Sequence, residues 1–209
     1  MNRLNTKIFA AWLPVLVAVL AMRAPMADPV VSPLDLLQKT SDDVIRVLKA
    51  RADELEKNPE QIYDLVNQYI IPHLDDVAMA KLALGKNWNK ASREQKIEFV
   101  EQFRTLLVRT YGKSLLEYRN QTINFFPLKL DPGDDRVEVK SEVQQPGAPS
   151  IPVTYRLRLK DDEWKVYDLS IDGVSLVTSY RGTFAQEVRK SGMAGLLQLL
   201  RDKNGKAST

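Results

Sequence analysis

Hydrophobic residues recur at helical spacing through the first half of the chain and at alternate positions through much of the second half. In the first half, four segments have the amphipathic spacing of helices, with start or stop signals near their ends. They run from Ser32-Pro33 to Leu48, from about Pro59 to Ile71, from Asp75 to Leu84, and from Ser92 to about Tyr118. Pro72 ends the second segment and Gly85 the third. The first half is therefore expected to be helical.

The last of these segments has more apolar surface than an ordinary surface helix needs. Its apolar residues cover about half of the helix circumference at about 100° per residue, whereas a surface helix has a narrower stripe. They are Ile97, Phe99, Val100, Phe103, Leu106, Leu107, Tyr111, Leu115 and Tyr118. Such a helix is expected either to lie centrally in the core or to bury part of its apolar arc against something other than protein.

The second half of the chain has the pattern of a sheet. Its expected strands are residues 122–128, 136–143, 151–160 and 164–171, and the middle two alternate regularly between apolar and polar residues. Turns are expected at residues 131–134 and 161–163, and a longer loop from Gln144 to Ser150. Because the strands have one apolar face, the pattern predicts an antiparallel sheet of roughly four strands, covered on one side. The expected fold class is α+β.

Residues 164–182 join the last strand to a C-terminal helix. The strand is expected to end at Asp172-Gly173, and helical spacing resumes at Val174, Val177 and Phe184. The junction has no phosphate-binding glycine run, and its Gly-Val-Ser sequence is not followed by the second glycine of a nucleophile elbow. A specific junction without such chemistry suggests that its residues determine the shape of the fold or form an apolar surface.

The N-terminus has the order of a secretory signal peptide. Arg3 and Lys7 precede a largely apolar run from Ile8 to Met22, and small residues follow up to Ala27. An uncleaved membrane anchor is the alternative, but the run is short for a membrane-spanning helix. No Cys follows the run, which excludes a lipoprotein.

Residues 1–27 are therefore expected to be a signal peptide, followed by one domain over residues 28–203 and a polar tail over residues 204–209. Removing the three basic residues of the signal peptide leaves 27 basic and 27 acidic residues. The mature chain is then formally neutral, so the basic pI gives little support to a nucleic-acid partner. With no Cys, the domain must rely on its own core.

The chain offers few candidates for catalysis. His73, its single histidine, is expected to be a local cap or a surface residue, and there is no second His or Cys for a typical zinc site. Asp168 and Asp172 form a conceivable carboxylate pair, but Asp172 is expected to cap the following helix. Tyr180-Arg181 is expected to make an intrachain ion pair rather than to present a cation to an anionic headgroup. These residues indicate neither an enzyme nor a metal site.

Two sets of residues resemble the MlaC family of phospholipid-binding proteins, also called toluene-tolerance or ABC-transport auxiliary proteins. The C-terminal set is Trp164, Val166, Asp168, residues 171–177, Tyr180-Arg181, Phe184 and Gly192. The helical set is Pro72, Met79-Ala80, Leu84-Gly85, Trp88, Gln95, Phe99, Phe103, Leu106, Thr110-Tyr111, Leu115 and Tyr118. The long C-terminal string is the more specific, and together the two sets extend over nearly all of the mature chain.

The resemblance implies helices packed against a curved antiparallel sheet, with a deep apolar lipid pocket between them. It implies a periplasmic carrier that moves glycerophospholipid between an outer-membrane lipoprotein complex and the substrate-binding ring of an inner-membrane ABC transporter. Such a carrier would help to maintain outer-membrane lipid asymmetry. The lipid would be cargo, and no cofactor is implied. Two other classes stay open: an enzyme on the same fold, and a periplasmic chaperone or lipoprotein carrier that binds acylated or unfolded proteins.

Strand alternation and helical phase give a hypothesis for the residues that line this pocket. The inner sheet face would supply Val137, Val139, Val153, Tyr155 and Leu157. The helix that begins at Ser92 would supply Phe103, Leu107 and Tyr111.

Overall fold

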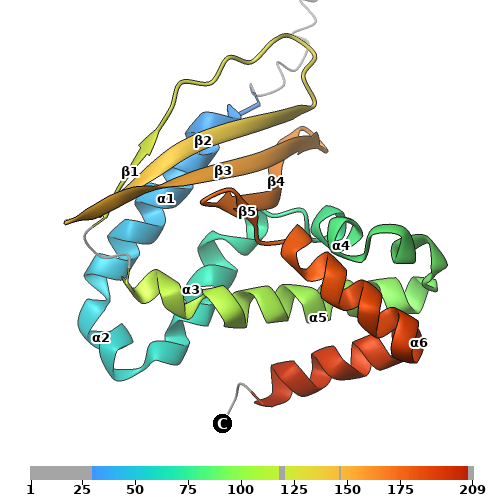
Figure 1. Ribbon diagram of the computed structural model, residues 1–209. Coiled ribbons are helices and arrows are strands. Elements are labelled where there is room, and N and C mark those ends of the chain that lie inside the picture. Colours follow the sequence, from blue (N-terminus) through green and yellow to red (C-terminus); the bar gives the residue numbers. More distant parts are fainter. Residues whose placement is uncertain (1–29, 118–120, 146, 207–209) are drawn as a thin grey trace, which may run out of the picture.

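The computed structural model describes residues 30–117, 121–145 and 147–206 of the chain. A twisted sheet lies over a layer of helices, and α1 crosses the sheet on the side that faces this layer (Figure 1). This arrangement confirms the expected α+β fold.

The helical part begins with three helices and their connecting 3₁₀ turns. These are α1 (Pro33–Ala50), α2 (Ala52–Lys57), η1 (Pro59–Gln61), α3 (Ile62–Tyr69) and η2 (Ile71–His73). Ser32 begins α1 as predicted, since its side chain accepts a hydrogen bond of 3.0 Å from the amide of Asp35. The single helix expected from Pro59 is shorter than predicted, because its first residues and those around Pro72 form 3₁₀ turns.

Two further helices follow, α4 (Asp76–Leu84) and α5 (Arg93–Tyr111), joined by η3 (Gly85–Lys90). Ser92 and Gln95 form a capping box at the start of α5, as the sequence indicates. This helix ends at Tyr111, earlier than predicted, and the chain continues through Gly112 into η4 (Lys113–Glu117). The predicted end at Tyr118 lies outside the described residues.

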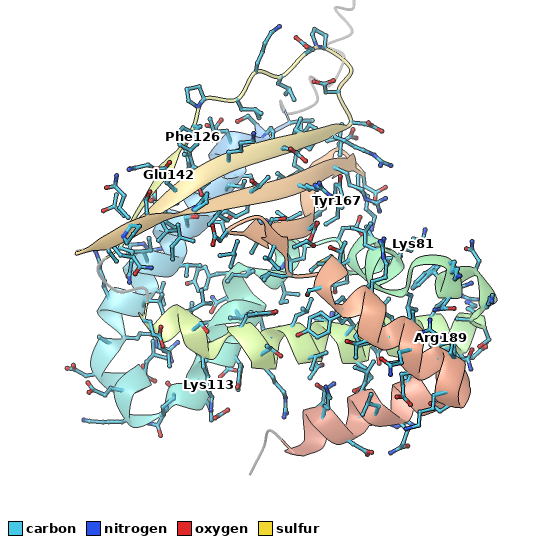
Figure 2. The ribbon with its side chains drawn as sticks, viewed as in Figure 1. Lys81, Lys113, Phe126, Glu142, Tyr167 and Arg189 are labelled. Carbon is cyan, nitrogen blue, oxygen red and sulfur yellow. The ribbon has the colours of Figure 1, made fainter. Side chains whose placement is uncertain are left out.

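The sheet has five antiparallel strands in sequence order, one more than expected. They are β1 (Thr122–Phe125), β2 (Arg136–Gln145), β3 (Ala148–Lys160), β4 (Glu163–Ile171) and β5 (Val174–Ser175). The longer loop predicted for residues 144–150 is wrong, because β2 extends to Gln145 and β3 starts at Ala148. The side of the sheet that faces the helices is called the inner face below. Figure 2 shows Glu142 on the opposite side.

The Asp172-Gly173 junction is a tight hairpin between β4 and β5. Both residues have a positive φ, +50° and +77°, which is the combination that a type I′ turn requires. The chain then passes through η5 (Thr178–Tyr180), and α6 (Arg181–Lys206), whose two helical parts are joined by a kink at Gly192, starts only at Arg181. The prediction that helical structure resumes at Val174 is therefore wrong. Asp172 closes a turn and does not cap a helix.

Three apolar clusters hold the described residues together. One joins α4, α5 and α6, the second joins α1 to the sheet, and the third joins α1, α2 and α3. Leu74 packs against the first and the second. Within the described ranges, no helix combines the length and the apolar character needed to cross a membrane.

Candidate functional site

One end of the inner sheet face belongs to none of the three core clusters. Strand register aligns six apolar positions across all five strands there, and we call them the distal strip: Ile123, Val143, Ile151, Val153, Ile171 and Val174. Val143 and Val153 are buried, the three isoleucines are half-buried, and Val174 is 60% exposed. The six positions lie outside the core clusters and four of them keep part of their surface accessible, so the strip is a candidate ligand-binding surface.

The distal strip meets a cleft of about 620 Å³ between α1 and β1. Its lining residues are Gln38, Ser41, Asp42 and Ile45 from α1 and Gln121, Thr122, Ile123, Asn124 and Phe125 from the segment that contains β1. Ile123 is common to both surfaces, so the cleft continues into the strip. Polar side chains surround the few apolar ones. Such a lining is expected where the polar end of a bound amphipathic ligand reaches the solvent. The volume lies within the range of about 300–1,000 Å³ for ligand pockets.

On the helical side, the apolar arc of α5 divides into two parts. Phe99, Phe103 and Leu106 are buried in the cluster with α4 and α6. Leu107 is half-buried and packs against the edge of the same cluster, and Tyr111 is half-buried next to Tyr180. The Tyr111 hydroxyl shares a hydrogen bond with Tyr180, and burial, together with this neighbour, raises the pKa of Tyr111 to about 12. Tyr111 is therefore neutral at physiological pH and adds no charge to this side.

Phe103 lies in the protein core. It is 1% exposed and contacts three other rings, at centroid distances of 5.6 Å for Phe99 and 5.5 Å for both Tyr180 and Phe184. Edge-to-face and stacked rings at these distances are a stable packing arrangement. The structure thus brings Phe103 together with core aromatics and not with the distal strip.

The predicted sheet residues also occupy different environments. Val139 and Leu157 are buried under α1, and Val137 and Tyr155 pack against the same cluster. Among the five, Val153 alone lies in the distal strip. Sequence reasoning missed Ile45, Ile123, Phe125, Val143, Ile151 and Ile171. Alternation marks most of them as inward-facing, but the register that brings them together is not readable from the pattern.

The carboxylate pair does not form a catalytic site. Asp168 is fully buried, and its Oδ1 accepts hydrogen bonds from Ser175 Oγ at 2.6 Å and from the Leu169 amide at 2.9 Å. Its Oδ2 lies 3.6 Å from a guanidinium nitrogen of Arg156. Asp172, in contrast, is exposed in the hairpin turn. Asp168 therefore fixes β5 and the start of η5 against the sheet.

We expect Asp168→Asn to lower the free energy of unfolding by about 2 kcal/mol, because it removes charge-assisted hydrogen bonds from a buried site. The matched variant Asp172→Asn should change stability by less than about 0.5 kcal/mol, since Asn also adopts the positive φ of this turn. Urea denaturation of both variants measures the difference. Equal effects of the two substitutions would contradict the structural role assigned to Asp168.

Arg181 is used within the chain, although not in the ion pair that the sequence suggested. Its guanidinium donates two hydrogen bonds, of 2.8 and 2.6 Å, to the carbonyl oxygen of Leu82. This carbonyl lies in the last turn of α4, where cations are favourable. The contact joins the start of α6 to the end of α4.

His73 borders a small hollow of about 120 Å³ between α1 and the α3–η2 segment. It is half-buried, and burial, followed by the positive charge of Lys165, lowers its pKa below the usual 6.5. Among the described residues, no group of three or more His, Cys, Asp or Glu side chains is arranged to hold a metal ion. His73 is a local structural residue.

The titration of His73 is a testable consequence. The NMR signal of this single histidine should titrate below pH 6.5, and Lys165→Gln should move the midpoint part of the way upward, because burial remains. Since the unfolded chain binds the proton at higher pH, stability should fall as pH decreases below 6.5. Replacing His73 with Gln should reduce this fall. A midpoint at or above 6.5 would contradict the described environment.

Comparison with known proteins extends this picture. The model of the family described as MlaC protein matches residues 38–202. The toluene tolerance protein ttg2D of Pseudomonas putida is 32% identical over 162 residues, which are 77% of this chain and 75% of that protein. The intermembrane phospholipid transport system binding protein MlaC of Haemophilus influenzae is 25% identical over 186 residues, 88% of this chain and 86% of that protein.

A solved structure is also similar, the phospholipid-binding protein of Ralstonia solanacearum in complex with a phospholipid. It is 32% identical, with a TM-score of 0.76, and the match covers 88% of this chain and all of the solved one. The fold, the length of the match and the family model agree with the resemblance that the sequence motifs indicate. The chain belongs to the MlaC family.

Proposed function

We propose that this protein binds a glycerophospholipid and carries it between two membranes. The acyl chains would lie along the distal strip, and the headgroup would lie at the polar edge of the α1–β1 cleft. The observation that supports this most is the apolar strip outside the core clusters, which continues into a cleft with polar sides. The names of the Haemophilus and Ralstonia relatives, which refer to phospholipid, support the same assignment.

The free energy of lipid transfer favours a carrier that docks onto its partners. Burial of acyl chain gains about 0.8 kcal/mol per CH₂ relative to water, so a chain of about sixteen carbons gains on the order of 10 kcal/mol. Each 1.4 kcal/mol is about a tenfold preference, so a lipid with two such chains rarely leaves into water. Transfer of the lipid into another apolar site changes the free energy only slightly. The carrier therefore hands its lipid over directly, without a catalytic step or a nucleotide of its own.

We further propose that the protein works in the periplasm after removal of residues 1–27. Its partners would be an outer-membrane lipoprotein complex and the substrate-binding ring of an inner-membrane ABC transporter. The phospholipid-transport name of the Haemophilus relative supports a partner system of this kind. The signal peptide lies outside the described residues, so its support comes from the sequence pattern.

Organic extraction of the purified protein, followed by mass spectrometry, tests the lipid assignment. We expect intact diacyl phospholipid in an amount comparable to that of the protein. Recovery of acylated peptide would favour a lipoprotein carrier or chaperone instead. Absence of any lipid, together with failure to take up phospholipid from vesicles, would overturn the proposal.

A further inference from the structure

The inner face of β2 has one polar residue in an otherwise apolar row. Ser141 lies between Val139 and Val143 on this face, and strand register places Phe125 of β1 and Val153 of β3 beside it. Its side chain is 1% exposed, and its Oγ has no hydrogen-bond partner. A buried hydroxyl without a partner is destabilising, so this residue is unexplained by the packing of the lipid-free protein.

Two aromatic rings lie over this part of β2. Phe125 and Tyr155 belong to the strands on either side of β2, which are about 10 Å apart in a sheet. Their ring centroids are nevertheless only 5.9 Å apart, so the rings converge above the strand between them. A small residue at position 141 leaves room for this arrangement. Both rings are half-buried, and Phe125 also lines the α1–β1 cleft.

The unpaired hydroxyl therefore lies under two rings at the boundary between the cleft and the distal strip. This is the depth at which the acyl chains of a diacyl lipid begin if its headgroup occupies the cleft. The first polar atoms above the chains are ester carbonyl oxygens, which accept hydrogen bonds and donate none. Within the described residues, Ser141 is the only buried side chain without a hydrogen-bond partner on the inner sheet face.

We propose that Ser141 is a polar subsite that donates a hydrogen bond to an ester carbonyl of the bound lipid, after the Phe125 and Tyr155 rings move aside. This inference rests on the proposed lipid-binding function and specifies it further: the site distinguishes ester-linked from ether-linked lipids. An ether-linked chain lacks the carbonyl oxygen, so the hydroxyl loses this acceptor.

The test compares two lipids of equal headgroup and chain length, a diacyl phosphatidylglycerol and its dialkyl ether counterpart. Their affinities for the delipidated protein are measured by displacement of a fluorescent fatty acid. The wild type should bind the ester lipid about five- to tenfold more tightly. Ser141→Ala should lose this preference by weakening ester-lipid binding alone. Ser141→Thr, which keeps a hydroxyl, should retain the preference, as should the control Ser150→Ala on an exposed position.

A second measurement separates this role from a structural one. The Tm of lipid-free Ser141→Ala should equal or exceed that of the wild type, because the substitution removes an unpaired buried hydroxyl. The increase in Tm on ester-lipid binding should be smaller in the variant. Equal wild-type affinity for the two lipids, or equal weakening of both by Ser141→Ala, would overturn the subsite. Failure of the wild type to bind either lipid would instead overturn the proposed function itself.

Discussion

Val153→Glu should give folded protein that co-purifies with less than about a tenth of the phospholipid found in the wild type. Val153 lies in the middle of the distal strip, on the central strand β3, and belongs to none of the core clusters. Because Val153 is buried without lipid, the carboxylate also lowers the stability of the lipid-free protein, so lipid occupancy is compared per folded molecule. Acyl chains in the same place must remove the remaining water from the carboxylate, which costs several kcal/mol. Because each 1.4 kcal/mol corresponds to a tenfold change in affinity, several kcal/mol weaken lipid binding by more than about a hundredfold, and occupancy should fall accordingly.

Thr154→Glu is the matched control. Thr154 is the next residue of β3 and points to the outer face, where Lys140 is its neighbour on β2. The two variants add the same charge to the same strand on opposite sides of the sheet. Both should retain the circular dichroism spectrum of the wild type, and Thr154→Glu should keep its lipid. Full lipid occupancy in Val153→Glu would contradict the assignment of the distal strip.

Phe103→Ala should lower the free energy of unfolding by about 3–5 kcal/mol. The phenyl ring is buried among three other aromatic rings, so its removal leaves a cavity that rigid helices on both sides cannot fill. In a domain of this size, the loss corresponds to a decrease in Tm of about 10 °C. The amount of lipid per folded molecule should change little, because the ring faces the helical core. Thermal denaturation and lipid extraction on the same sample measure both effects.

Leu107→Ala provides the comparison on the same helix. Leu107 is half-buried, so its truncation should cost less stability than that of Phe103. If the second part of the α5 arc faces the lipid, this variant should lose more lipid than Phe103→Ala does. The reverse order, with lipid loss in Phe103→Ala and a small change in its Tm, would contradict the core assignment of Phe103.

The ends of several elements were predictable because they depend on local chemistry. Ser32, Ser92 and Gln95 cap helices by hydrogen bonds to nearby amides, and these signals are readable from spacing alone. The alternation in β2 and β3 predicted their faces for the same reason. The strand β5 was missed because two residues are too few for a pattern. Its formation depends on the turn at Asp172-Gly173 and on the burial of Asp168.

The candidate site was less predictable, because it depends on how surfaces meet. At about 100° per residue, Leu107 and Tyr111 lie roughly 80–120° around α5 from Phe99, while Phe103 lies roughly 40° away. The sequence shows one wide apolar arc, but the boundary between the core part and the remaining part depends on where α4 and α6 pack. Likewise, the α1–β1 cleft contains residues far apart in sequence, such as Ile45 and Ile123.

The position of the bound acyl chains is the central claim, and photocrosslinking measures it directly. A diacyl phospholipid with a diazirine at the middle of one chain would be loaded into the purified protein, irradiated, and the labelled peptides identified by mass spectrometry. We predict labels on the distal strip, with further labels near Ile45 and from Leu107 to Tyr111. Labels confined to the outer sheet face, or to the α6 residues that pack in the helical core, would contradict this account.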